Sequence, residues 1–208
     1  MGSDLSVVNA ARVSFNKQKE EFDDKDEKLI AYLVKHGHWS PLSHPKISLR
    51  VSMPFAIARQ WEKHRIGCVR GYDIYDHNEV SRRYVDDPPT FFIPDEWRQR
   101  PDKSMKQGSG DAHPEQDKAR DRFLCAVRTA EHQYEELIKM GIAPEQARFV
   151  LPVCTYTTWI ETGSLAYWAR LCILRQDEHA QQEIQELAQQ VSDIIAPLFP
   201  VSWKELMK

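Results

Sequence analysis

Apolar and polar positions alternate along residues 45–53 and predict a β-strand. The apolar positions are Ile47, Leu49, Val51 and Met53. Successive side chains of a strand point to opposite faces, so one face of this strand is expected against a core and the other in solvent. We expect a helix to follow, with Pro54 at its first position and its end near Arg65, because proline fits the first turn of a helix.

Apolar positions spaced three or four residues apart predict helices elsewhere. Such helices are expected over residues 23–36, 118–140, from 144 for a short stretch, 162–174 and 178–196. Pro197 and Pro200 are expected to end the last of them. The polar segments 67–77 and 95–116 are expected to be loops, the second at the surface. The 208 residues therefore predict a single α+β domain in which helices pack on a small mixed or antiparallel sheet.

Charge and composition narrow the classes of function. The formal net charge is −3, so no basic excess indicates binding to nucleic acid or to an anionic membrane. The uncharged run at residues 149–160 is too short to span a bilayer, and residues 1–4 resemble no secretion signal. The four cysteines form no metal-ligand spacing. We therefore expect a cytoplasmic protein with free thiols and no metal.

Three polar residues share one face of the helix expected after Pro54. Gln60, Lys63 and His64 stand at helical spacing, so their side chains point the same way. An amide, an ammonium and an imidazole together can bind a phosphate or a polar heterocycle. The same spacing also fits a solvated helix face, and the spacing alone does not separate these interpretations.

Residues 78–84, which read NEVSRRY, combine a carboxylate, a hydroxyl and two guanidinium groups. Arg82 and Arg83 can bind a phosphate with their planar forks, and Ser81 can add a hydroxyl hydrogen bond. A surface cluster of ion pairs is the alternative interpretation. No Ser-His-Asp arrangement surrounds Ser81, so a nucleophilic serine is not indicated.

Two arginines lie inside apolar runs of the sequence. Arg148 is followed by Phe-Val-Leu-Pro, and Arg175 ends the run Leu-Cys-Ile-Leu. A guanidinium in such surroundings needs an anionic or polar partner. That partner is either a structural carboxylate or a ligand, and both remain open.

In their order along the chain, these pieces resemble the flavin-dependent thymidylate synthase family. The family signature is Arg-His-Arg, a spacer, and Asn-Glu-x-Ser-x-Arg-Tyr, matched here by residues 63–65 and 78–84. Further similar segments are residues 4–6, 10–15, 35–38, 58–61, 147–152 and 174–181. The resemblance covers most of the chain and implies an α+β fold assembled as a homotetramer, with active sites at subunit contacts.

The resemblance also implies a methyltransferase reaction carried out by a flavoprotein. FAD would be bound, dUMP would be methylated to dTMP, methylenetetrahydrofolate would supply the carbon unit and NADPH would reduce the flavin. Carried over by position, the FAD contacts would be Ser14, His38, Ser40, Lys63, His64, Arg65, Glu79, Ser164 and Arg170. The dUMP contacts would be Gln60, Lys63, Ser81, Arg82, Arg83, Arg148 and Arg175. Arg175 would also be catalytic, as a cation that stabilises negative charge developing on the uracil ring.

The sequence departs from the family pattern at three places. Lys63 replaces the first Arg of the signature and loses its planar fork. The spacer at residues 66–77 is longer than usual, and we expect it at the site mouth, where Arg70, Tyr72 or Tyr75 can touch flavin or folate. Residues 160–166 lack the usual Trp, Asn and Arg of the flavin-binding helix.

These departures keep other functions open. A sister enzyme would hydroxymethylate dUMP or methylate another pyrimidine nucleotide. A non-catalytic binding protein that retained the scaffold would purify without the yellow colour of flavin. A nucleic-acid binder is disfavoured by the acidic net charge.

Overall fold

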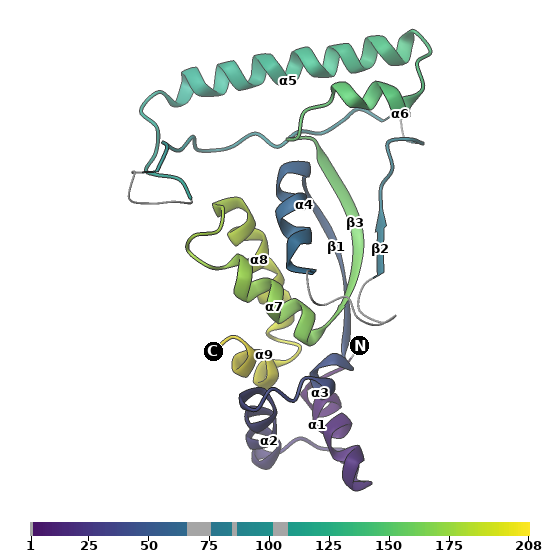
Figure 1. Ribbon diagram of the computed structural model, residues 1–208, viewed down its shortest axis with the longest axis vertical. Helices are drawn as coiled ribbons and strands as arrows, with labels where there is room; N and C mark the ends of the chain where they lie inside the picture. Colours follow the sequence, from purple (N-terminus) through teal and green to yellow (C-terminus); the bar gives the residue numbers. More distant parts are fainter. Residues whose placement is uncertain (1, 66–75, 85–86, 102–107) are drawn as a thin grey trace. The chain divides into compact units, whose positions relative to one another are not determined.

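A computed structural model describes residues 2–65, 76–84, 87–101 and 108–208, with the side chains of residues 65, 76 and 77 excepted. Figure 1 shows the elements along the chain. In order, they are α1 (Asp4–Arg12), the 3₁₀ turn η1 (Val13–Phe15), α2 (Asp24–Lys35), α3 (Ser40–Ser43), β1 (Lys46–Pro54), α4 (Phe55–Glu62), the 3₁₀ turn η2 (Lys63–Arg65), β2 (Asp76–Glu79), α5 (Gln116–Lys139), α6 (Pro144–Ala147), the 3₁₀ turn η3 (Arg148–Val150), β3 (Tyr156–Ser164), α7 (Leu165–Arg175), α8 (Gln182–Ile195) and α9 (Pro200–Leu206).

The described strands form one three-stranded sheet in the order β1-β3-β2. Leu165 N donates to Pro45 O at one end of the β1–β3 pair, and Phe55 N donates to Thr155 O at the other. The start of one strand thus meets the end of the other, which makes the pair antiparallel. A small sheet combined with many helices confirms the predicted α+β class.

The chain divides into two compact units, and β1 and β3 each contribute residues to both. The first unit holds Met1–Leu49, Lys63–His77 and Glu161–Lys208. The second unit holds Arg50–Glu62 and Asn78–Ile160.

Helices supply most of the core of the first unit. Within it, α7 packs against α8, α2 against α9, and α1 against α3. The amphipathic α8 buries one stripe of side chains at helical spacing: Ile184, Ala188, Val191 and Ile195. The buried carboxylate of Asp4 accepts hydrogen bonds from Val201 N at 2.9 Å and Ser202 N at 2.8 Å, so α1 satisfies the free N–H groups that open α9.

A buried carboxylate joins α1 to α2 in the same unit. Asp26 is fully buried and accepts from Arg12 Nη2 and from Lys19 Nζ, both at 2.6 Å. Burial by itself raises the pKa of the Asp26 carboxyl. The hydrogen bonds from Lys19, from the Asp23 backbone and from Arg12 outweigh that effect and lower the pKa from 3.8 to about 2. The carboxylate is therefore charged at neutral pH and holds the two helices together through ion pairs.

In the second unit, aromatic side chains connect its helices and strand segments. Trp61 of α4 lies edge-on against Trp159 of β3, with ring centroids 6.4 Å apart. The polar segment 95–116 was predicted as a surface loop, and its described parts contain no helix up to Gln116, which opens α5. It is nevertheless attached to α5, because Trp97 packs on Phe123 at 5.1 Å and Gln116 Nε2 donates to Trp97 O at 2.7 Å.

Several predicted elements are confirmed and others are wrong. The strand β1 and the helices α2, α5 and α6 lie within two residues of their predicted positions. Pro54 ends β1 instead of opening a helix, because a proline without an N–H is tolerated where a strand ends. The helix predicted over 162–174 begins only at Leu165, after β3. The helix predicted from 178 begins at Gln182. Pro200 was expected to terminate a helix, but it occupies the first turn of α9.

Two further expectations concern the membrane and the cysteines. None of the helices in the described part of the chain combines the length and apolar character that crossing a bilayer requires. Cys125, Cys154 and Cys172 are free thiols, and Cys68 lies outside the described residues. Burial raises the pKa of the Cys172 thiol to about 12, so this side chain is an unreactive part of the core.

Candidate functional site

The turn after β2 holds a hydroxyl and two guanidinium groups in the second unit. Arg82 Nη1 donates to Asp87 O at 2.8 Å, which fixes the first guanidinium against the backbone. Ser81 Oγ accepts from Arg83 Nε at 3.2 Å, and the Arg83 guanidinium lies over the ring of Tyr84, 5.0 Å from its centroid. The exposed Arg83 and the half-buried Arg82 and Ser81 are thus brought together, as a phosphate site requires.

The last residue of β2 has a fixed carboxylate. Glu79 accepts a short hydrogen bond from the hydroxyl of Thr157, which is buried in β3. The adjacent Val80 N donates to Thr158 O at 2.9 Å, so the signature segment is attached to β3 by both backbone and side chain. Glu79 as a whole is exposed.

Gln60 and Arg148 belong to the same unit but lie on other elements. Gln60 is half-buried on α4. Arg148 opens η3, and its Nε donates to Glu145 O at 3.3 Å. The sequence around Arg148 is apolar, but the structure does not bury this residue fully. Phe149 beside it is 80% exposed. Arg148 is a half-buried cation beside exposed apolar surface.

Residues of the short turn η2 belong to the first unit and differ in exposure. Lys63 is exposed, whereas His64 is only 1% exposed and packs on Tyr167 with ring centroids 4.5 Å apart. Arg170 Nε donates to His64 O at 3.4 Å and connects α7 to this turn. The His64 side chain is thus part of the packing within this unit, and the exposed cations near it are Lys63 and Arg170.

Tyr167 is held from several sides where β3 passes into α7. Its hydroxyl donates a short hydrogen bond to Glu161, and both side chains are buried. Its backbone N–H donates to Ser164 Oγ at 3.1 Å, which makes the buried Ser164 the N-cap of α7. A Cβ at Gly163 would lie 2.1 Å from Tyr167 Cδ1, so the ring occupies the space that a side chain there would need. Trp168 packs edge-on against the same ring at 5.2 Å.

The predicted contacts near the N-terminus are exposed. Ser14 lies in η1 and Ser40 opens α3, and both side chains face solvent. His38 follows α2 and lies edge-on to Tyr32, with ring centroids 5.7 Å apart. These hydroxyl and imidazole groups are available to a polar ligand.

Arg175, the expected catalytic cation, is the last residue of α7 and is half-buried. Burial lowers the pKa of its guanidinium. Guanidinium groups remain charged at neutral pH in proteins, so Arg175 stays a cation in a partly desolvated position. Such a cation can stabilise negative charge that develops on a bound ring.

The structure groups the predicted residues by unit. One group, in the first unit, comprises Ser14, His38, Ser40, Lys63, His64, Arg65, Ser164, Arg170 and Arg175. The other, in the second unit, comprises Gln60, Glu79, Ser81, Arg82, Arg83 and Arg148. The expected contributors Arg70, Tyr72 and Tyr75 lie outside the described residues, and so does the side chain of Arg65.

Sequence reasoning missed Glu161 and Tyr167. Glu161 lies in segment 160–166, where this chain departs from the family pattern, and Tyr167 directly follows that segment. Their polar groups meet only after β3 has passed into α7. A buried carboxylate six residues before a tyrosine has no recognisable spacing in a sequence. Across the described residues, no group of three or more His, Cys, Asp and Glu side chains is placed so that it could hold a metal ion.

The fold and these groups define a class: an α+β protein with exposed or half-buried cations on its turns and at its helix ends. Residues 1–201 match the family described as "Thymidylate synthase complementing protein". The chain belongs to this family, which confirms the resemblance carried by the signature residues.

Curated relatives and solved structures agree with this assignment. A flavin-dependent thymidylate synthase of Thermosipho africanus is 35% identical over 209 residues, spanning 100% of this chain and 88% of that protein. That of Anaplasma marginale is also 35% identical, over 97% of this chain and 67% of the relative. Among solved structures, the UMP/dUMP methylase PolB from Streptomyces cacaoi, bound with 5-Br dUMP, has a TM-score of 0.84 and 29% identity, covering 98% of this chain and 90% of that one.

Proposed function

We propose that this protein is a flavin-dependent thymidylate synthase that methylates dUMP to dTMP. The observation that carries the proposal is the ordered signature at residues 63–65 and 78–84, within a family match that spans residues 1–201. Methylenetetrahydrofolate is the proposed carbon donor and NADPH the proposed reductant. The relatives that support it are named flavin-dependent thymidylate synthases.

The nucleotide is proposed to bind through the second unit's cations. Arg82 and Arg83 offer two guanidinium groups on one turn, beside the Ser81 hydroxyl, and this donor set suits a phosphate. Gln60 has an amide that can hydrogen-bond to the uracil edge, and Arg148 adds a half-buried cation. No nucleophilic side chain is required of these residues.

FAD is proposed to bind the exposed polar groups of the first unit, and Glu79 of the second unit is proposed separately as a FAD contact. Ser14, His38, Ser40, Lys63 and Arg170 have free surface and suit an anionic, polar cofactor. The Ser164 hydroxyl caps α7, and the His64 ring is buried against Tyr167. These two predicted contacts are therefore proposed to act by shaping the backbone around the cofactor.

In this proposal the chain orients the reactants and stabilises charge. When bound and reduced, the flavin supplies the hydride that completes the methyl group. Arg175 stabilises negative charge developing on the uracil ring, because its partly desolvated guanidinium is already in place before reaction. The subunits are proposed to assemble as a homotetramer with active sites at subunit contacts and to act in the cytoplasm, where free thiols stay reduced.

The second candidate substrate is UMP. The solved PolB structures bear the name UMP/dUMP methylase, and one of them contains 5-Br UMP. Because PolB is 29% identical to this chain, dUMP and UMP should be tested in competition for this enzyme.

The deciding experiment incubates the protein with dUMP, methylenetetrahydrofolate, NADPH and FAD and measures the nucleotide by mass spectrometry. A mass gain of one methylene unit is expected, because a methyl group replaces a hydrogen. A gain of one CH₂O unit would identify a hydroxymethylating enzyme, and preference for UMP in an equimolar mixture would identify the alternative substrate. A colourless protein that leaves both nucleotides unchanged would refute the proposal in favour of a non-catalytic binding protein.

A further inference from the structure

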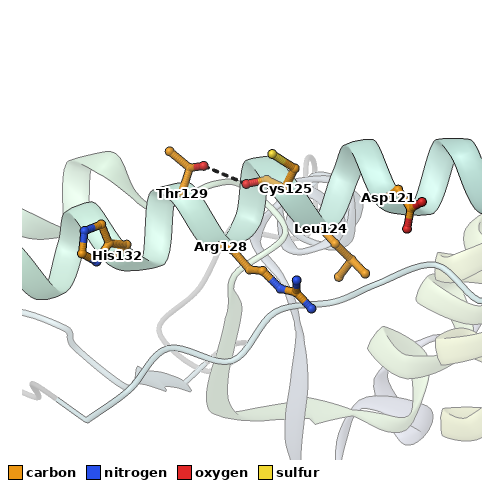
Figure 2. A pocket seen from close by; sticks show the side chains of 6 residues that line it. All are labelled: Asp121, Leu124, Cys125, Arg128, Thr129 and His132. Carbon is orange, nitrogen blue, oxygen red and sulfur yellow. Dashed lines mark hydrogen bonds between the residues drawn. The ribbon is translucent and has the colours of Figure 1, made fainter.

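The long helix α5 has an exposed face that no described residue covers. Of its residues, only Val127 and Tyr134 are buried. A shallow hollow of about 590 Å³ lies along α5, and Figure 2 shows the side chains that line it. The lining residues are Asp121, Leu124, Cys125, Arg128, Thr129 and His132.

Charges along this face follow a definite order. Asp117, Asp121, Arg128 and His132 are separated by four, seven and four residues, which correspond to whole turns, so they form one stripe. The first two are acidic and the last two basic, and all four are exposed; the exposed acidic residue Glu135 follows two turns beyond Arg128. Within the described part of the chain, Asp121 and Arg128 form no ion pair. This stripe on α5 is called the charge stripe below.

The charge stripe is complementary to itself when its direction is reversed. Asp121 and Arg128 lie equally far from the midpoint between residues 124 and 125, and so do Asp117 and His132. A two-fold axis at that midpoint would place each acidic residue opposite a basic residue of a second copy. A parallel arrangement would instead set carboxylate against carboxylate, which is destabilising. This property favours a second copy of the same chain over an unrelated partner, because two-fold interfaces are self-complementary.

We propose that the charge stripe of α5 binds the charge stripe of a second copy in antiparallel orientation. Asp121 of each copy then pairs with Arg128 of the other, and Leu124 and Cys125 lie beside the two-fold axis next to their own counterparts. The inference rests on the proposed function only because both expect copies of this chain to assemble into an oligomer. It assigns one contact within that oligomer. A single helix pair buries less than the roughly 1,200–2,000 Å² of a stable interface, so further contacts accompany it.

Charge reversal tests the contact. Asp121→Arg and Arg128→Asp each place like charges opposite one another at two positions, so each variant is expected to halve the particle mass measured by analytical ultracentrifugation at low ionic strength. An equimolar mixture of the two variants restores complementary pairs and is expected to regain the wild-type mass. The double variant is expected to do the same. Arg122→Asp is the matched control, since it makes the same change on α5 away from the charge stripe.

A crosslink provides a second measurement. A short bismaleimide is expected to join Cys125 to Cys125 of the second copy, because both thiols lie near the axis and Cys125 is exposed on α5. The product would be a band of twice the chain mass that disappears in Cys125→Ser. Helix axes in contact lie about 8–10 Å apart, which a short crosslinker spans.

The inference is overturned if the wild type is monomeric, if neither reversal changes the particle mass, or if the mixture fails to regain it. It is also overturned if the crosslinked band persists in Cys125→Ser. Methylation of dUMP by the wild type is measured separately. Methylation without a response to charge reversal removes only this inference, whereas the charge response without methylation removes only the proposed reaction.

Discussion

The hydroxyl of Tyr167 donates a hydrogen bond to the carboxylate of Glu161, and the pair is buried where β3 passes into α7. A buried carboxylate is costly unless hydrogen bonds stabilise its charge. The tyrosine supplies one such bond while its ring supports His64 of the signature. Glu161 lies in the segment that departs from the family pattern, and His64 belongs to the family signature. Tyr167 contacts both residues and therefore connects them.

Replacing the phenol of Tyr167 removes a hydrogen bond without emptying the ring's space. Tyr167→Phe is expected to lower the free energy of unfolding by about 1–3 kcal/mol, because the buried Glu161 carboxylate loses a donor. Urea unfolding followed by circular dichroism measures the change. The control is Tyr32→Phe, at a tyrosine that is 53% exposed, and its effect should stay near zero. Equal stability of Tyr167→Phe and wild type would show that the bond contributes nothing.

The lowered pKa of Asp26 predicts that the free energy of unfolding decreases in acid. Its folded-state pKa of about 2 lies below the ordinary 3.8, so folding favours the charged form. The stabilisation is complete above the ordinary value and is lost as pH falls through the folded-state value. Between about pH 4 and pH 2, the free energy of unfolding is therefore expected to decrease with falling pH.

Asparagine at this position tests the assignment. Asp26→Asn is expected to be less stable at neutral pH and to show a shallower pH dependence, since it cannot titrate. Asp24→Asn, an exposed change on the same helix turn, is expected to keep the wild-type slope. A slope unchanged in Asp26→Asn would assign the acid sensitivity to other groups.

Removing the guanidinium of Arg175 is expected to reduce catalysis while the protein stays folded. Arg175→Ala is expected to lower kcat/KM for dUMP methylation by about 10²–10³-fold, the usual effect of removing one charge-stabilising group. The unfolding midpoint should change little, because removing a half-buried cation also removes its desolvation cost. Lys204→Ala, an exposed change on α9, serves as the control for charge alone. Retention of wild-type turnover by Arg175→Ala would exclude the residue from the site.

Lys63 stands where the family signature has an arginine. Lys63→Arg is expected to keep or improve FAD affinity, because it restores a planar fork to an exposed position on η2. Lys63→Ala is expected to weaken binding by about tenfold, which corresponds to 1.4 kcal/mol. Quenching of flavin fluorescence during titration measures both. Collapse of flavin binding in Lys63→Arg would mean that the geometry of this turn differs from the family's.

Much of the architecture follows from apolar periodicity, but β3 does not. The residues that β3 buries are Thr157, Trp159, Glu161, Gly163 and Ser164. Most of them are polar or lack a side chain, so the strand shows no apolar alternation. Their burial becomes favourable only through partners such as Tyr167, which a local pattern cannot reveal. The prediction that Pro200 ends a helix was wrong for a different reason, because a proline can either follow the end of a helix or occupy the first turn of the next one.

The residues of the candidate site also divide into those that the sequence could identify and those that it could not. Ser81, Arg82 and Arg83 could be chosen from the sequence because they are contiguous and their turn keeps them together. The burial of His64 and the capping role of Ser164 could not, because both depend on Tyr167, which follows them in the chain and packs back on them. Contiguous motifs are therefore readable in advance, whereas the supporting contacts require the fold.

The absence of a side chain at Gly163 has a consequence for how this segment can diverge. The ring of Tyr167 fills the volume beside that glycine and is itself held by His64 and Trp168. Substituting one position alone would produce either a collision or a void. Sequence drift in this segment should consequently proceed in pairs, with bulk appearing at position 163 only in descendants that have already lost the aromatic ring at 167.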